Sequence, residues 1–404
     1  MPDPDTDTTI HLAQDFVQDP YALYDRLREE QPVVPVTLPR GLRVWLVTRF
    51  ADVRAALADQ RLRKDHERMR ALVRERLPNG TGTMFTSALA AHMLNSDPPD
   101  HDRLRNLVNA AFTTRRVRDM RPRIEDIAQA LLDHLGPAEK IDLVPSFAFP
   151  LPVTVICELL GVPARDRDEF RSWTNTLLST SGMEDARAAS VSMTTYLTDL
   201  VATKRADPGP DMLSALVATR DSGDRLTETE LISMAFLLLV AGHETTVNLI
   251  GNGMLALLRN PGQLAVLRAD RSLLPGAIEE FLRYEGPVNL ASLRHTSEPV
   301  ELSGVRIPAD EFVVVSLASA NHDQRRYDDP DRLDLRRDTA GHLAFGHGVH
   351  YCLGAPLARL EAEVAFGALL DRYQHIELAV PPENLRWRLS AVLRGLTELP
   401  LIVR

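Results

Sequence analysis

One long apolar segment limits what this chain can fold into. It begins at Thr227-Glu228-Thr229-Glu230, a pattern typical of a helix capping box, and keeps a helical spacing of apolar residues until Asn260-Pro261. About 30 residues at 1.5 Å each give a helix of roughly 45 Å. Residues 234–241 are apolar nearly all round, but they are far fewer than the roughly 20 residues that span a bilayer. We therefore expect a helix that runs through a protein core, and no membrane anchor.

Composition narrows the class of protein. Hydrophobic residues make up 44% and charged residues 25% of 404 residues, which is typical of a globular enzyme and excludes disordered, collagen-like and coiled-coil classes. The formal net charge of −10 gives no support for binding nucleic acid or anionic membranes. Two cysteines, Cys157 and Cys352, and an acidic start without a signal-peptide pattern favour a protein of the reducing cytoplasm.

The rest of the chain favours a mainly α fold with small β-sheets. Asp19-Pro20 predicts the start of a helix that ends near Glu30. Alternating apolar residues predict a strand pair at 33–36 and 43–48, and further strands at 300–302, 305–307 and 312–317. Residues 77–96 contain no Asp, Glu, Lys or Arg, and we expect them to form a lid over a site. No repeat or linker divides residues 1–404, so we expect one domain.

The middle of the long helix has an unusual composition. Ala241, Gly242, His243, Glu244, Thr245 and Thr246 place a glycine, an acid and two β-branched hydroxyls where a buried helix normally carries apolar residues. Glycine there costs about 1 kcal/mol relative to alanine. One interpretation is close packing at Gly242, with Glu244 reaching solvent. The other is a widened helical groove that offers a hydroxyl and a carboxyl group to a ligand.

A glycine-rich segment from Phe345 to Gly354 carries Cys352 to the start of a predicted helix. The helix dipole and free N–H groups there are expected to lower the pKa of the thiol and to favour metal binding. The glycines leave room for a flat cofactor. Two alternatives remain at this point: a buried structural cysteine, or a zinc site formed by His342, His347, His350 and Cys352, although paired cysteines at short spacing are lacking.

This segment resembles the cytochrome P450 superfamily of haem-thiolate monooxygenases. Residues 345–354 meet the pattern Phe-Gly-x-Gly-x-His-x-Cys-x-Gly, and the motifs at 241–245 and 280–283 follow in the family's order, so the resemblance covers essentially the whole chain. It implies the single-domain cytochrome P450 fold, with a helical bundle around the long helix. It also implies haem b as cofactor, with Cys352 as axial thiolate ligand of the iron.

The resemblance assigns roles to further residues. Residues around the cofactor would be Phe345, Gly346, Gly354 and Ala241, and the haem propionates would be bound by His101, Arg105, Arg294 and His350. Glu280 and Arg283, alone an ordinary helix ion pair, would form a structural network completed by Arg332. Thr245 would hold O2 and a water molecule, and Glu244 would connect this relay to bulk protons.

The resemblance to actinobacterial macrolide-tailoring members is closer, through residues 238–250 and 279–288. By analogy, residues of a mostly apolar substrate pocket would be Met84, Phe85, Leu89, Met93, Leu94, Trp173, Leu177, Leu237, Val240, Val288, Leu290, Ala291 and Val392. These segments carry no acid, which favours a neutral ligand: a macrolide or similar polyketide, or alternatively a steroid or terpenoid. Hydroxylation and epoxidation stay open, and a non-catalytic haem sensor is the alternative from another class.

Electrons must come from separate proteins, because the sequence shows no dinucleotide-binding fingerprint or flavin domain. A ferredoxin and its reductase are expected, acting on a monomer. Five arginines predict either a docking patch for an acidic ferredoxin or a solvated helix face: Arg115, Arg116, Arg118, Arg121 and Arg123.

Overall fold

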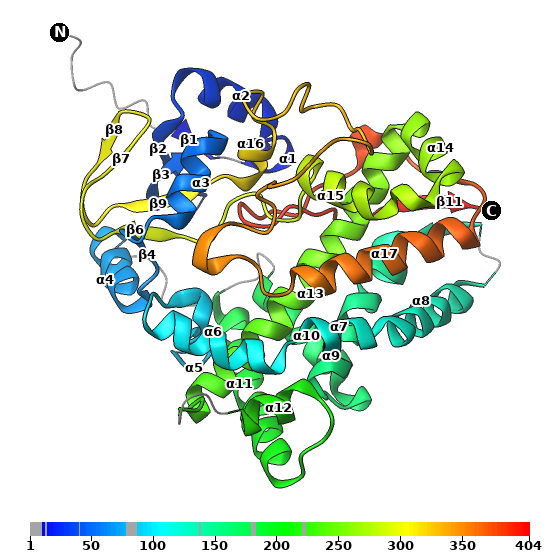
Figure 1. Ribbon diagram of the computed structural model, residues 1–404, viewed down its shortest axis with the longest axis horizontal. Coiled ribbons are helices and arrows are strands. Elements are labelled where there is room, and N and C mark those ends of the chain that lie inside the picture. The colour runs from blue at the N-terminus through cyan, green and yellow to red at the C-terminus, as the bar shows by residue number, and fades with distance from the viewer. Residues whose placement is uncertain are drawn as a thin grey trace.

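The computed structural model describes residues 10–12, 14–39, 41–77, 87–136, 139–178, 183–219 and 224–404. Helices dominate it (Figure 1). They are α1 (Gln14–Gln18), α2 (Tyr21–Glu30), α3 (Phe50–Ala58), α4 (His66–Arg76), α5 (Ser87–Ala90), α6 (Asp100–Ala111), α7 (Thr114–Asp119), α8 (Arg121–Leu135), α9 (Pro150–Leu160), α10 (Arg167–Leu178), α11 (Met183–Ala206), α12 (Met212–Ala218), α13 (Glu228–Arg259), α14 (Pro261–Ala269), α15 (Leu274–Tyr284), α16 (Leu317–Asn321) and α17 (Ala355–Arg372).

The strands form small sheets. They are β1 (Ile10–His11), β2 (Val33–Thr37), β3 (Arg43–Val47), β4 (Leu62–Arg63), β5 (Lys140–Asp142), β6 (Arg294–Thr296), β7 (Val300–Leu302), β8 (Val305–Ile307), β9 (Phe312–Val315), β10 (Ile376–Leu378) and β11 (Pro400–Val403). One sheet has the order β1-β2-β3-β9-β6-β4, a second has β10-β11-β5, and β7 pairs with β8. The mainly α class with small sheets is thus confirmed.

Helix α13 is the predicted long helix. The capping box is present, because the Thr227 hydroxyl accepts from the Glu230 N–H and the Glu230 carboxylate accepts from the Thr227 N–H. The helix is long and apolar enough to cross a membrane, but 67% of its most apolar window is buried by α5, α9, α11, α15 and α17 packed against it. This confirms the expected core helix.

Several strand predictions hold within two residues, and other strands were missed. β2 and β3 pair antiparallel, with Val34 opposite Leu46, and β9 ends at Val315 rather than at 317. The missed strands are β1, β4, β5, β6, β10 and β11, which have two to four residues each. The expected lid is described only from residue 87 on, where α5 and a short turn at Met93–Asn95 follow one another.

Candidate active site

The cysteine loop is shaped by its backbone. The Cys352 N–H donates to the Phe345 carbonyl at 2.9 Å, which closes the loop. Gly346 and Gly348 both have φ of +73°, and a Cβ at Gly348 would lie 2.9 Å from the Leu57 carbonyl oxygen, so both positions require glycine. Helix α17 starts directly after the loop, and the N–H groups of Gly354 and Ala355 point to the Cys352 sulfur.

The acidity of the thiol differs from the prediction. Burial raises the pKa of Cys352 above its ordinary value, and this effect exceeds the lowering by the two N–H groups and by Arg105 and Arg359. The residue is accessible from the cavity that it lines, while protein atoms surround its sulfur closely enough to disfavour the charged thiolate. The expectation that a helix start alone lowers the pKa is therefore wrong here. A metal cation deprotonates a coordinating thiol outright, so the site still fits a metal–thiolate bond.

The loop borders a cavity of about 340 Å³ that adjoins α13. Every residue predicted to surround the cofactor lines it: Ala241, His101, Arg105, Arg294, Phe345, Gly346, His350, Cys352 and Gly354. Apolar side chains cover most of the remaining wall. A flat apolar group with acidic substituents fits such a lining, because apolar walls and concentrated cations complement its two parts.

The cations gather in one corner of the cavity. Arg294 is 3% exposed and donates to the Ser292 carbonyl at 3.2 Å; burial lowers the pKa of Arg294 to about 10. His101 is 1% exposed, and its Nε2 has no hydrogen-bond partner among the described residues, whereas its Nδ1 lies 2.9 Å from Asp102. Burial and the neighbouring cations lower the pKa of His350 to about 2. Lys64, which we did not predict, lies in the same lining.

Arg105 is placed differently from the other predicted propionate ligands. Its guanidinium donates to the carbonyls of Val349 at 3.0 Å and Tyr351 at 2.7 Å, so it braces the cysteine loop as well as lining the cavity.

Each interpretation of the middle of α13 agrees with the structure only in part. A Cβ at Gly242 would lie 3.0 Å from Ile156 Cδ1, so close packing explains this glycine. Thr245 lines the cavity, and its hydroxyl donates to the Ala241 carbonyl at 2.9 Å. Through this region α13 is a continuous α-helix.

Glu244 neither reaches solvent directly, as one interpretation required, nor lines the cavity as described. It is 1% exposed, and its Oε2 accepts from Arg388 Nη1 at 2.6 Å. The other oxygen, Oε1, has no hydrogen-bond partner and lies 3.8 Å from His243 Nε2. The Arg388 side chain is 29% exposed, so it joins the buried carboxylate to the protein surface.

The substrate-pocket prediction divides into three groups. Residues that line the cavity are Met93, Leu94, Leu237, Val288, Ala291 and Val392. Leu89, Leu177 and Leu290 are instead fully buried in core packing, Trp173 packs against Tyr196 with ring centroids 5.6 Å apart, and Val240 packs partly buried against the core. Met84 and Phe85 lie outside the described residues.

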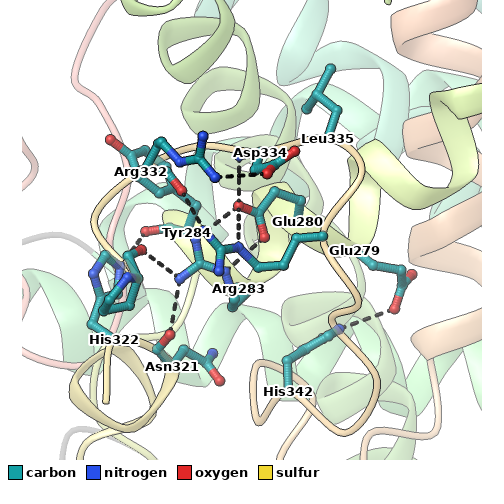
Figure 2. Close-up of polar contacts among 12 residues, drawn as sticks. Glu279, Glu280, Arg283, Tyr284, Asn321, His322, Arg332, Asp334, Leu335 and His342 are labelled. Atoms are coloured by element: carbon teal, nitrogen blue, oxygen red, sulfur yellow. Dashed lines mark hydrogen bonds and ion pairs between the residues drawn. The ribbon is translucent and has the colours of Figure 1, made fainter. Parts of the chain in front are cut away.

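The predicted ion-pair network exists with one member exchanged (Figure 2). Arg283 donates to both oxygens of Glu280, at 2.7 and 2.8 Å, and both side chains are 0% exposed. Arg283 also donates to the carbonyls of Asn321 and Pro330. Arg337, not Arg332, is the second arginine on Glu280, at 3.3 Å. Arg332 is 61% exposed and pairs with Asp329 and Asp334.

The ligand set of the zinc alternative is not assembled. His342 Nε2 lies 3.0 Å from Glu279, and the His342 Nδ1 accepts from the Ala344 N–H. His350 stacks edge-on against His101, with ring centroids 4.4 Å apart. Within the part of the chain that the structure describes, no three His, Cys, Asp or Glu side chains converge as metal ligands.

Comparison with known proteins agrees with this architecture. Residues 177–395 match the family model described as Cytochrome P450. Cytochrome P450 107B1 of Saccharopolyspora erythraea is 54% identical over 96% of this chain and 95% of its own. The 6-deoxyerythronolide B hydroxylase of the same organism is 44% identical, with 96% of each chain covered. The structure of the P450 monooxygenase TamI bound to tirandamycin C has a TM-score of 0.92 and 52% identity, covering 98% of this chain and 100% of that one.

These findings define the class of protein: a monooxygenase of the haem-thiolate type, in which a cysteine binds the haem iron. The chain belongs to the cytochrome P450 family, and it is similar to the polyketide-tailoring members that its sequence resembled.

Three polar residues of the site were missed from the sequence: Lys64, Arg337 and Arg388. Lys64 carried one signal, because it is one of only three lysines among 46 basic residues. No sequence pattern marked Arg337 or Arg388, because each lies near other arginines. Arg337 bonds to Glu280, 57 residues away, and Arg388 bonds to Glu244, 144 residues away.

Proposed function

We propose that residues 1–404 form a single haem-thiolate monooxygenase domain that binds haem b and oxidises a neutral lipophilic natural product of the macrolide or polyketide class. The observation that carries this proposal is one cavity bordered by Cys352, by Thr245 of α13 and by a cationic corner. The product is an alcohol, or an epoxide where the substrate offers an alkene. The enzyme acts in the cytoplasm as a monomer and takes two electrons from a ferredoxin and its reductase.

In this proposal the chain binds two parts of the cofactor, the iron and the propionates. When bound, a haem-thiolate group supplies the reductive activation of O2. Cys352 ligates the iron, held by a loop whose glycines let N–H groups approach the sulfur. Arg294, His101 and His350 bind the propionates, and the unpartnered His101 Nε2 supports this role because a buried ring nitrogen needs an acceptor or donor. Arg105 supports the loop carbonyls and completes the cationic corner.

Proton delivery falls to two neighbouring residues of α13. Thr245 holds a proton at its hydroxyl on the cavity side, where apolar walls exclude bulk water. Glu244 supplies protons to Thr245 from the side of α13 that does not line the cavity. The hydrogen bond between Glu244 and the partly exposed Arg388 supports a connection to solvent. The Glu244 Oε1, which has no hydrogen-bond partner among the described residues, is free to accept a hydrogen bond or a proton at this position.

The substrate is argued from the cavity lining. Among the described residues, no Asp or Glu lines the cavity, and Glu184 and Asp185 at the start of α11 are exposed. A similar chain is named a hydroxylase of 6-deoxyerythronolide B, and another binds tirandamycin C. These two relatives support a polyketide, while a protein named Vitamin D(3) 25-hydroxylase, 48% identical to this chain, supports the alternative of a steroid-like substrate.

The ferredoxin would meet the exposed arginines of α7 and its surroundings. Arg121 and Arg123 are already paired, with Glu363 and Glu158 respectively, and Arg116 donates to the Ala111 and Pro210 carbonyls. Arg115 is 86% exposed and 3.8 Å from Asp119, and Arg118 is exposed, so these two offer the most accessible positive charge. The docking patch is therefore smaller than the five-arginine cluster in the sequence.

The proposal is tested by the ferrous-CO spectrum and by turnover. The protein purified with haem should show the Soret band of thiolate ligation, and Cys352→Ser should lose it. Cys157→Ala is the matched control, because Cys157 is buried in α9 away from the cavity, and it should keep the band. Product formed from a macrolactone with O2, ferredoxin and reductase separates the enzyme from a haem sensor. A thiolate band that persists in Cys352→Ser contradicts the assignment.

A further inference from the structure

Lys64 is a buried cation to which no function has yet been assigned in the site. It is 2% exposed, and it follows β4 directly. β4 pairs antiparallel with β6, with Arg63 opposite His295, so the same register continued by one residue sets Lys64 opposite Arg294. Both side chains line the cavity. The pairing of two short strands therefore places two buried cations next to each other.

The hydrogen bonds of Lys64 leave its charge unbalanced. Its Nζ donates to the Leu94 carbonyl at 3.2 Å and to the Ser292 hydroxyl at 2.5 Å, and both acceptors are neutral. An ammonium group has three donors, so one remains after these two bonds. The nearest acid, Asp97, is engaged by the Lys64 backbone N–H at 3.0 and 3.1 Å. Burial and Arg294 lower the pKa of Lys64 well below its ordinary value, and Asp97 only partly opposes this.

The polar groups around Lys64 also keep free positions toward the cavity. Among the described residues, Arg294 has one carbonyl partner, and the His101 Nε2 has no hydrogen-bond partner, although its Nδ1 lies 2.9 Å from Asp102. A buried charge is stable only when it is paired and hydrogen-bonded, and a cluster of like charges raises the requirement. An anionic ligand that reaches this corner would satisfy Lys64, Arg294 and His101 together.

We propose that Lys64 binds a carboxylate of the haem and, through its bond to Leu94, ties the substrate-side segment at Met93–Asn95 to the cofactor. This inference rests on the proposed function, because it takes the cavity to be the haem site. Lys64 is then a ligand of the cofactor's acidic group and a positioning residue for the pocket wall. Met93 and Leu94 both line the cavity, so the tether joins the cofactor corner to the predicted substrate pocket.

The first test compares haem release from three purified variant holoproteins with haem release from wild type. Lys64→Gln keeps a hydrogen-bond donor for Leu94 and Ser292 but removes the charge, and Lys64→Arg keeps the charge. Lys140→Gln is the matched control, because Lys140 is an exposed lysine of β5. We expect Lys64→Gln to release ferric haem to an excess of a haem-scavenging protein at least tenfold faster than wild type, with Lys64→Arg close to wild type and the control unchanged.

The reduction potential separates a charge effect from a packing effect. Loss of a cation beside the haem stabilises the ferric state, so the potential of Lys64→Gln should fall while that of Lys64→Arg does not. Faster haem release with an unchanged potential would mean that Lys64 only supports Leu94 and Ser292, and would overturn the proposal. Unchanged release and potential would overturn it as well. A wild-type protein that lacks haem would instead contradict the proposed function.

A second test uses the wild-type holoenzyme and does not depend on how a variant folds. The chain has only three lysines, so nitrogen-15 labelling at Nζ gives three signals in an NMR spectrum. Lys140→Arg and Lys204→Arg assign two of them. The third, Lys64, should be strongly shifted or broadened by ferric iron and should sharpen in the diamagnetic ferrous-CO form. If none of the three signals differs between the ferric and the ferrous-CO forms, Lys64 does not lie next to the haem.

Discussion

Two groups of buried charges in this protein differ in how the charges are balanced. Around Glu280 and Arg283 every charged group has partners. Arg283 and Arg337 share the Glu280 carboxylate, and backbone groups bond to Glu280 and Arg283. Figure 2 shows Arg283 and Glu280 within this network. In the cavity corner, Lys64, Arg294 and His101 face one another without a carboxylate among the described lining residues. A satisfied network holds the fold by itself, whereas an unsatisfied one indicates where a ligand of opposite charge binds.

The largest expected effect breaks the satisfied network. Arg283→Met leaves the Glu280 carboxylate buried with one arginine, and it leaves the Asn321 and Pro330 carbonyls without their donor. Removing one partner of a buried pair costs about 3–5 kcal/mol. We expect this loss in the free energy of unfolding, measured by urea titration with circular dichroism.

The control for Arg283 is the exposed arginine that the sequence favoured. Arg332→Gln should change stability by about 0.5 kcal/mol or less, because its side chain is 61% exposed. Equal losses in the two variants would show that burial does not separate Arg283 from Arg332.

A smaller effect concerns Glu279, a neighbouring carboxylate that is paired but partly exposed. It accepts from Arg359 at 2.6 and 2.8 Å and lies 3.0 Å from His342, and these groups hold the pKa of Glu279 at about 2 despite burial, which would raise it. A lowered carboxyl pKa contributes stability in full above the ordinary value of 4.5, and this contribution is lost as the pH falls toward 2. With its side chain 26% exposed, we expect Glu279→Gln to cost about 2 kcal/mol at pH 7.

The pH dependence distinguishes this charge effect from simple packing. The stability difference between wild type and Glu279→Gln should shrink as the pH is lowered below about 4.5, as followed by urea midpoints. Glu301→Gln on β7, which is exposed, should show no such trend. A difference that is constant down to pH 3.5 would mean that the ion pairs do not determine the stability effect.

The cavity side should show the reverse pattern, with function changed and stability preserved. Thr245→Ala removes the hydroxyl that lines the cavity, so product formed per nicotinamide oxidised should fall about tenfold, with the oxygen diverted to peroxide. Thr203→Ala is the control, because its hydroxyl makes the same type of bond to the carbonyl four residues earlier, on an exposed face. Unchanged coupling in Thr245→Ala would remove Thr245 from the proton relay.

The comparison also explains what the sequence predicts and what it does not. The capping box at Thr227 and the glycine-flanked Cys352 depend on neighbours within a few residues, and the structure has both as expected. Contacts between distant segments are different. Arg337 replaces Arg332 on Glu280 because the loop folds the later arginine inward, and local spacing contains no such information.

The degree of burial of a side chain is a second property that the spacing of residues in the sequence does not determine. The resemblance to macrolide-tailoring members assigned Leu89 and Leu177 to the substrate pocket, but core packing buries both side chains. The prediction of a lowered pKa for Cys352 was wrong for the same reason. The helix start can be predicted from the sequence, but the desolvation that outweighs its effect is a property of the folded loop.

The smallest expected effect sharpens the unbalanced side of the comparison. If the cavity contains cations and the described lining lacks acids, a ligand with an ammonium group finds no partner there. For an amine whose pKa lies a little less than one unit above pH 7, loss of the proton on binding limits the penalty to about 1 kcal/mol, or about fivefold in affinity. We therefore expect a neutral macrolactone to bind about fivefold more tightly than its amino-glycosylated counterpart at pH 7, measured by the low-to-high spin shift of the haem.

The pH dependence tests the cause of this difference in affinity. Because deprotonation relieves the penalty, the difference in affinity should narrow as the pH rises toward the pKa of the amine, while the affinity of the neutral compound stays constant. Tighter binding of the charged compound at pH 7 would show that an acid, such as Glu184 or Asp185 of α11, folds over the cavity when a substrate binds.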